Sequence, residues 1–89
     1  MITKEILSEA NKLVGGDRQK DYGDKVKNHN NISKLWSAYL ETPVTAHDVA
    51  IMMALLKVAR TKLGAVSRDT YVDMSAYSAI AGEIKFKEK

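Results

Sequence analysis

The sequence contains no cysteine, one proline and two histidines among its 89 residues. Without cysteine the chain can form no disulfide, no thiolate zinc site and no cysteine nucleophile. Two histidines are too few for a histidine-built metal centre, so any metal would be held mainly by carboxylates. The length fits a single small domain over residues 1–89 and leaves no room for a separate cofactor module.

The sequence also lacks a long apolar run and a strong excess of one charge. The longest apolar run, residues 49–56, is far shorter than the roughly 20 residues that span a bilayer, and we expect no signal peptide. Fourteen basic and eleven acidic residues leave a net charge of +3, and no expected helix has a one-sided basic stripe. We therefore expect a cytoplasmic protein whose partners include neither a membrane nor nucleic acid.

Four segments show the apolar spacing of helices, and none shows the alternation of a strand. The expected helices cover residues 3–14, 30–40, 45–63 and 67–86. Glycine or proline follows the first three of them, as at many helix ends. Asp48 lies three residues after Thr45 and predicts a capping box at the start of the third helix. The expected fold class is all-α, a small four-helix domain.

The two middle helices carry most of the apolar residues. In the second, Trp36 and Tyr39 are spaced as core residues, whereas His29 lies just before the helix and is expected at the surface or as a capping group. The third is apolar nearly all round, which is typical of a helix buried on several sides. Either it is the central helix of the domain, or a second subunit packs against it. We expect a dimer or higher oligomer formed through this helix.

The segment between the first two expected helices, residues 15–28, is rich in glycine and in charges of both signs. Loops of this length in a small domain are commonly functional or disordered. Two interpretations fit: a mobile surface connector, or an ordered loop in which Arg18, Lys20 and backbone N–H groups contact an anion.

Asp73 is a carboxylate on the apolar side of the fourth expected helix, and Asp69 lies one turn earlier on the same side. Burying an unpaired carboxylate costs several kcal/mol, so Asp73 requires a positive partner. Candidates are three basic side chains or a bound divalent cation: Arg60, Lys57, Arg18. An Asp73–Arg60 ion pair joining the last two helices is one interpretation, a phosphate or metal site is the second, and exposure of Asp73 to solvent is the third.

The order of several short motifs resembles a group of short phage and prophage proteins of unassigned function. The resemblance extends from about residue 6 to residue 81 and is carried by these motifs: Gly-Asp-Arg-Gln-x-x-Tyr-Gly at residues 16–23, Leu35-Trp36, Tyr39-Leu40, Asp48-Val49, Leu56-Lys57-x-Ala59-Arg60, Asp69-x-Tyr71-Val72-Asp73 and Tyr77. If the chain is phage-encoded, its compartment is the cytoplasm of the host cell.

That group is in turn distantly similar to the nucleotide-modification-associated and MazG-like all-α proteins, which include nucleoside triphosphate pyrophosphohydrolases. The resemblance implies Mg²⁺ held by Asp69 and Asp73, with Asp48 as a weaker candidate, because Mg²⁺ prefers carboxylate oxygens and bridges to phosphates. It further implies that basic side chains contact the phosphates while Tyr22 stacks on a base; the basic residues are Arg18, Lys20, Lys57 and Arg60.

The chain departs from the MazG-like pattern at the first acidic motif. Neither middle helix contains Glu-x-x-Glu: the second has only Glu41 at its end, and the third has only Asp48 at its start. The expected function is therefore a nucleotide- or phosphate-binding role, as a degenerate Mg²⁺-dependent pyrophosphohydrolase-like domain with no catalytic residue assigned. The alternative is a non-catalytic phage protein that binds and modulates a host factor.

Overall fold

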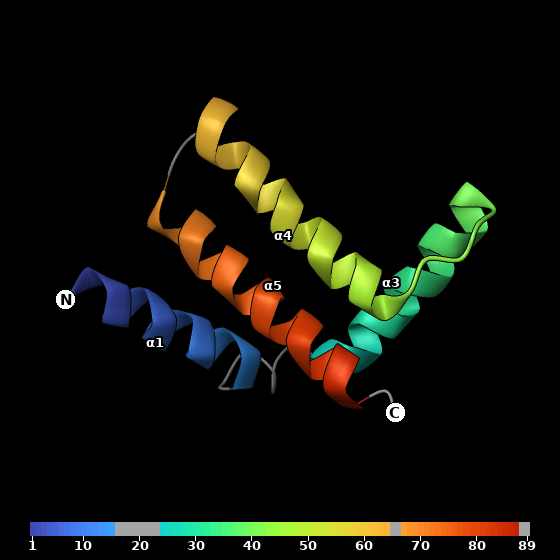
Figure 1. Cartoon of the computed structure of the whole chain (residues 1–89), viewed down its shortest axis with the longest axis horizontal. Coiled ribbons are helices and arrows are strands. Elements are labelled where there is room, and N and C mark those ends of the chain that lie inside the picture. The colour runs from blue at the N-terminus through green and yellow to red at the C-terminus, as the bar shows by residue number, and fades with distance from the viewer. Residues whose placement is uncertain (16–23, 65–66, 88–89) are drawn as a thin grey trace.

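The structure, a computed structural model, describes residues 1–15, 24–64 and 67–87. These residues form four helices and no strand: α1 (Ile2–Gly15), α3 (Lys25–Leu40), α4 (Ala46–Leu63) and α5 (Arg68–Lys87) (Figure 1). The expected all-α, four-helix class is confirmed. None of the helices in the described ranges has the length and apolarity needed to cross a membrane.

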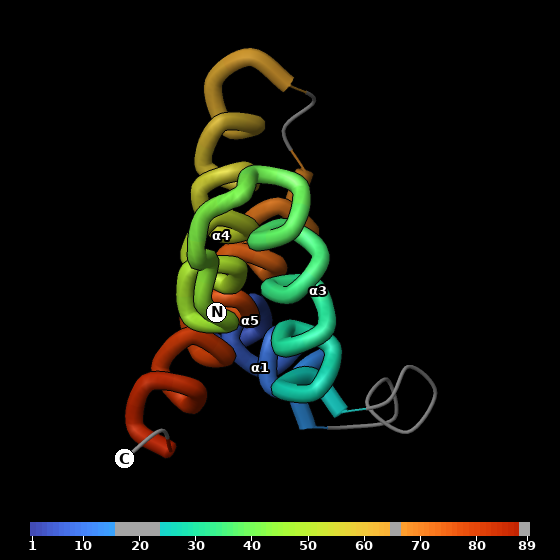
Figure 2. Tube along the Cα trace, turned by 90° about the vertical axis from the view of Figure 1, so that its right-hand side faces the viewer, coloured from blue at the N-terminus to red at the C-terminus, as the bar shows by residue number. Residues whose placement is uncertain are grey.

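The central helix of the fold is α5. It runs between α1 and α4 and also touches α3 (Figure 1), and its largest contact is with α4. Seen from the side, α3 stands next to α4 (Figure 2). Among the described helices, α4 packs on α5 and α3, so of the two interpretations of residues 45–63 the central helix is wrong, and packing by a second subunit stays a prediction. Its apolar residues are too widely distributed around the helix for two neighbours to cover.

Side-chain caps fix where α3 and α4 begin. Thr45 and Asp48 form the expected capping box: the Asp48 N–H donates to Thr45 Oγ1 and the Thr45 N–H donates to Asp48 Oδ2, both at 3.0 Å. Asp24 caps α3 by accepting hydrogen bonds from the backbone N–H groups of Val26 at 2.8 Å and Lys27 at 3.4 Å. This second cap starts α3 five residues earlier than the apolar pattern indicated.

The other helix ends lie close to their expected positions. α1 includes Gly15, which was expected to follow it, and Gly64 caps α4 as expected. The expected loop over residues 15–28 is shorter, because residues 24–28 belong to α3 and its cap; residues 16–23 lie outside the described part of the chain. The turn between α3 and α4 is held by Ser37, whose hydroxyl bonds to both the N–H and the carbonyl of Val44 at 2.8 and 3.1 Å.

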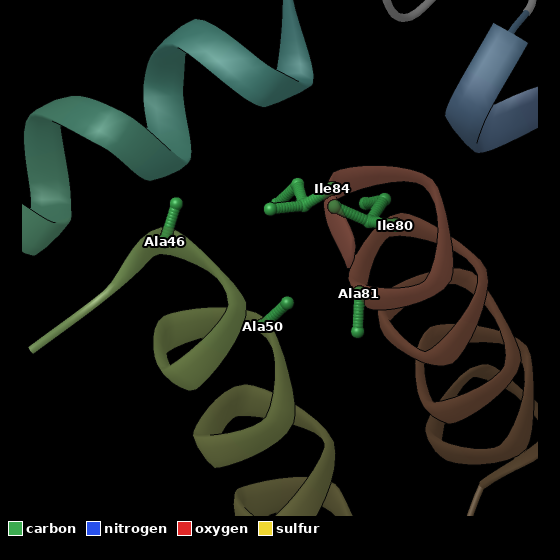
Figure 3. Packing of buried hydrophobic residues seen from close by; sticks show 5 residues of the cluster. All are labelled: Ala46, Ala50, Ile80, Ala81 and Ile84. Carbon is green, nitrogen blue, oxygen red and sulfur yellow. The ribbon is translucent and has the colours of Figure 1, made fainter. Parts of the chain in front are cut away.

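The core is small and is built largely from alanine and β-branched residues. Its main cluster joins α4 to α5 (Figure 3) and consists of Ala46, Ala50, Ile80, Ala81 and Ile84. A second cluster joins α1 to α5 and consists of Ala10, Val72 and Ala76. Small side chains on α4 let the two helix axes approach closely, so the isoleucines of α5 fill the space between them.

Large apolar side chains on α3 and α4 are exposed. Tyr39, which was expected in the core, is 87% exposed, whereas Trp36 is half-buried. The α3–α4 apolar surface comprises the following exposed residues: Leu35, Tyr39, Leu40, Ile51, Met52, Leu55, Leu56, Val58 and Leu63. The apolar residues of α3 do have helical spacing, but no helix in the described part of the chain covers the side of α3 that carries Leu35 and Tyr39.

Candidate functional site

Asp73 and Lys57 form an ion pair between α5 and α4. Lys57 Nζ lies 3.1 Å from Asp73 Oδ2, and the two side chains are only 20% and 30% exposed. Of the positive partners considered for Asp73, the structure therefore shows Lys57.

The interpretation in which Asp73 pairs with Arg60 is wrong. Lys57 lies two helical turns after Ala50, so it shares the face of α4 that packs on α5, where Ala50 is fully buried. Arg60 is turned away from that face and is exposed.

Asp73 also lines a cavity of about 390 Å³ that is open to solvent on one side and lies between α1, α3 and α5. We call it the central cavity. Its apolar wall comes mainly from α1 and α5, and its polar groups come mainly from the first two turns of α3; its lining residues are Leu13, Val14, Lys25, Asn28, His29, Asp73, Ala76, Tyr77 and Ile80. A volume of this size with a few converging polar groups is typical of small-molecule sites.

His29 is the most buried polar residue of the cavity wall, at 5% exposed. Its Nδ1 lies 2.8 Å from the carbonyl oxygen of Lys25, and because a carbonyl only accepts, Nδ1 carries the proton. Nε2 is buried with no hydrogen-bond partner in the described structure. The ring packs against Tyr77, with centroids 6.1 Å apart and planes tilted by 59°.

The expectation that His29 lies at the surface is therefore wrong. Because α3 starts at Lys25, position 29 is one full turn inside the helix. His29 then extends the stripe of Ile32 and Trp36 backwards at helical spacing, and that spacing was the signal in the sequence. Because Asp24 caps α3 before Lys25, His29 lies within the helix and belongs to this apolar stripe.

Asp69 and Asp73 lie together on a groove between α1 and α5, about 430 Å³ in volume, whose other lining residues are Glu9, Lys12, Leu13 and Val72. Asp69 is exposed. Glu9 is engaged by Arg68, whose Nη2 lies 3.3 Å from Glu9 Oε1. In the described ranges no three His, Cys, Asp or Glu side chains are placed to hold a metal ion. Two carboxylates do not complete a Mg²⁺ shell, so phosphate and water oxygens would have to supply the rest.

Of the remaining predicted site residues, Asp48 lies in the described part of the chain and three others do not. The carboxylate of Asp48 belongs to the cap of α4, and the hydrogen bonds from Thr45 hold the pKa of Asp48 below its usual value. Arg18, Lys20 and Tyr22 lie outside the described residues, so their predicted roles stay predictions. The structure thus brings Asp69, Asp73 and Lys57 to one end of the bundle and leaves Arg60 exposed on another face of α4.

The charges around the central cavity favour a negatively charged ligand. Lys57 neutralises Asp73 through the ion pair, and Lys25 on the wall adds a further positive charge. Tyr77 offers an aromatic ring to the same cavity. The arrangement can bind an anion that carries a flat group.

Comparison with known proteins gives a family and leaves the fold without a solved counterpart. The chain is 39% identical to the Gene 55 protein of Mycobacterium phage L5 over 84 residues, which cover 93% of this chain and 54% of that protein. It is also 39% identical to the Gene 55 protein of Mycobacterium phage D29 over 83 residues, covering 93% and 55% respectively. The chain therefore spans about half the length of these curated relatives. No solved structure matches it. A family model matches residues 5–85, and the chain accordingly belongs to the family described as "Domain of unknown function (DUF6378)", which has relatives among phage proteins.

Proposed function

We propose that this small phage-type helical protein binds a nucleotide or a related phosphate compound in the central cavity. The observation that carries the proposal is the lining of this cavity, which combines the aromatic ring of Tyr77 with the positive charge of Lys25, while Lys57 pairs with the carboxylate of Asp73.

The base and the phosphates of a nucleotide would each contact a different part of the cavity. Tyr77 packs against the base, and Lys25 at the α3 side of the cavity faces the phosphates. Arg18, Lys20 and Tyr22 precede α3 in the sequence, and we propose that Arg18 and Lys20 complete the phosphate contacts while Tyr22 stacks on the base. Mg²⁺ would accompany the phosphates, with Asp69 and the second oxygen of Asp73 contributing from the groove, because Asp73 Oδ2 pairs with Lys57.

Thermal shift with individual nucleotides, with and without Mg²⁺, tests this proposal. A ligand at 100 times its dissociation constant adds about 2.7 kcal/mol to the free energy of unfolding, which raises the melting temperature by many degrees in a domain of this size. Lys25→Met should weaken binding about tenfold, the effect of losing one partly screened phosphate contact. Lys27→Met is the matched control, since Lys27 is exposed on the same helix and does not line the cavity.

The same samples show whether the bound nucleotide is hydrolysed. A pyrophosphohydrolase converts a nucleoside triphosphate and water to the monophosphate and pyrophosphate, and phosphorus NMR resolves these products. Because Glu-x-x-Glu is missing from both middle helices, we expect binding without appreciable pyrophosphate release. No thermal shift with any nucleotide contradicts the binding proposal, whereas release of pyrophosphate that requires Asp73 would make the protein an enzyme.

A second candidate function is a non-catalytic interaction protein that modulates a host factor. The observation that favours it is the α3–α4 apolar surface, because soluble monomers rarely expose apolar patches larger than a few hundred Å². Host lysate passed over the immobilised protein should then yield one partner that Leu55→Glu no longer retains. Equal retention by both proteins would contradict this candidate.

A further inference from the structure

The outer face of α4 carries apolar side chains in the spacing of a helix–helix seam. Ile51, Leu55 and Val58 follow one another at intervals of four and three residues, and they are 39%, 59% and 45% exposed. This interval repeats every seven residues, as in paired helices. In the C-terminal half of α4, α5 lies on one side and no described helix on the other (Figure 1).

The same seam has opposite charges at its two ends. Continuing the spacing by one step in each direction reaches Asp48 and Lys62, each seven residues from Leu55, and both are exposed. A second α4 crossing antiparallel at Leu55 would place Asp48 against the partner's Lys62, twice by symmetry. A parallel pairing would instead set Asp48 on Asp48 and Lys62 on Lys62, and the helix dipoles would also repel.

From this charge pattern we infer that the outer face of α4 binds a second copy of this chain, antiparallel, on a two-fold axis at Leu55. A two-fold axis makes each surface its own partner, so Leu55 contacts the partner's Leu55. The inference concerns a surface separate from the central cavity and does not depend on the proposed ligand.

The available apolar area suits a stable dimer. An aromatic or other large side chain buries roughly 150–200 Å² when fully covered, and the nine residues of the α3–α4 apolar surface are between 39% and 93% exposed. Together they offer on the order of 800 Å², which is the area that each partner buries in a standard interface.

α3 extends this surface beside the N-terminal half of α4. Trp36, Tyr39 and Leu40 of α3 and Met52 of α4 together line an apolar cavity of about 380 Å³. In the antiparallel arrangement the C-terminal half of the partner's α4 runs beside α3 and the N-terminal half of α4. The exposed apolar side chains of the partner's α4 then cover the α3 residues that no described part of the same chain covers.

Substitution of Leu55 by opposite charges tests both the partner and the axis. By sedimentation equilibrium at about 100 μM, a dimer of micromolar affinity is the main species. Leu55→Glu and Leu55→Lys should each be monomeric, because like charges meet on the axis. An equimolar mixture of the two variants should form a heterodimer, because the charges then pair. Leu7→Glu is the control: Leu7 is 58% exposed on α1, so this variant should remain a dimer.

Every other outcome overturns the inference. A wild-type monomer at this concentration rejects a second copy as the occupant and leaves the surface to a host factor. If the mixed Leu55 variants stay monomeric, the two-fold axis lies elsewhere. Circular dichroism of each variant shows whether the helices are retained; should Leu55→Glu unfold, Lys62→Glu replaces it and should weaken dimerisation about tenfold by facing the partner's Asp48, whereas Lys85→Glu on α5 should not.

Discussion

Lys57 and Asp73 connect α4 to the cavity wall through a contact that is neither fully exposed nor fully buried. Exposed ion pairs contribute little to stability, whereas removing one partner of a buried ion pair strongly destabilises the fold. The intermediate exposure of these two side chains therefore places their coupling between these limits.

A double-mutant cycle with Lys57→Ala and Asp73→Ala should give a coupling of about 1 kcal/mol in the free energy of unfolding. Urea denaturation of the wild type, both single variants and the double variant measures it. The exposed Lys87–Glu83 pair, with Nζ and Oε1 2.9 Å apart, is the control and should show a smaller coupling. Equal coupling for the two pairs would mean that burial adds nothing to the Lys57–Asp73 contact.

Asp48 is expected to make stability depend on pH at the acid end. The backbone and hydroxyl hydrogen bonds from Thr45 lower the pKa of Asp48 in the folded state below the ordinary 3.8. A lowered carboxyl pKa stabilises the fold above the unfolded-state value, and this contribution disappears as the pH falls through the folded-state pKa. Wild type should therefore be more stable than Asp48→Asn at pH 7.

The difference between wild type and Asp48→Asn should shrink as the pH drops below 3.8. Thermal unfolding at a series of pH values, at a protein concentration low enough to limit association, measures it. A difference that stays constant from neutral to acid pH would show that the carboxylate charge makes no contribution to the cap.

At the scale of elements, the contact between α4 and α5 depends on small side chains. Ala50 is fully buried where the isoleucines of α5 pack, so an added side chain has no space unless the helices separate. Close-packed interiors tolerate such additions poorly. The spacing of these two helices also places Lys57 within reach of Asp73.

Ala50→Leu should lower the free energy of unfolding by about 1–3 kcal/mol, the usual cost of overpacking. It should also weaken nucleotide binding if that binding uses Asp73, because the helices that carry Lys57 and Asp73 move apart. Chemical denaturation and the thermal-shift titration provide both readings. Ala38→Leu on the exposed side of α3 is the matched control and should change neither.

On the scale of the whole molecule, the chain has a polar cavity on one side of α5 and an apolar surface on the other side of the fold. α5 is covered by α1, α3 and α4, whereas α4 and α3 leave large side chains uncovered. Such a surface lowers the solubility of a monomer and favours association, since covering apolar area contributes about 25 cal/mol per Å².

Association should make thermal stability depend on protein concentration. Only folded chains associate, so a higher protein concentration stabilises the folded state. The melting temperature of wild type should therefore rise with concentration between about 5 and 500 μM. Leu55→Glu should melt at one temperature over the same range, and differential scanning calorimetry measures both. A wild-type melting temperature that does not change with concentration would indicate that the described fold is stable as a monomer.

The helices were predictable because their signals are local. The Thr45–Asp48 cap and the glycine after residue 63 mark both ends of α4 in the sequence itself. The start of α3 was missed because Asp24 lies among charged residues, where a cap does not stand out from a loop. That one cap moved His29 from the expected surface to the buried wall of the cavity.

The candidate site was predictable only in part. An aspartate on the apolar face of an expected helix required a cation, and Asp73 has one in Lys57. Which cation it is depends on how α4 is rotated about its axis, and an arc of apolar residues that covers most of a helix does not fix that rotation. Lys25 and Tyr77 gave no signal as a pair, because they meet only through the packing of α3 on α5.

The sequence by itself determined four helices, the capping box of α4, the need of Asp73 for a positive partner, and an excess of apolar side chains over residues 45–63, because each follows from residue spacing within one helix. Only the tertiary structure decided that α5 lies at the centre, that Lys57 and not Arg60 meets Asp73, that His29 is buried and that the excess on α4 faces outward. The physical reason is that local patterns specify which side chains share a face, whereas the packing of all the helices together decides which of those faces is covered.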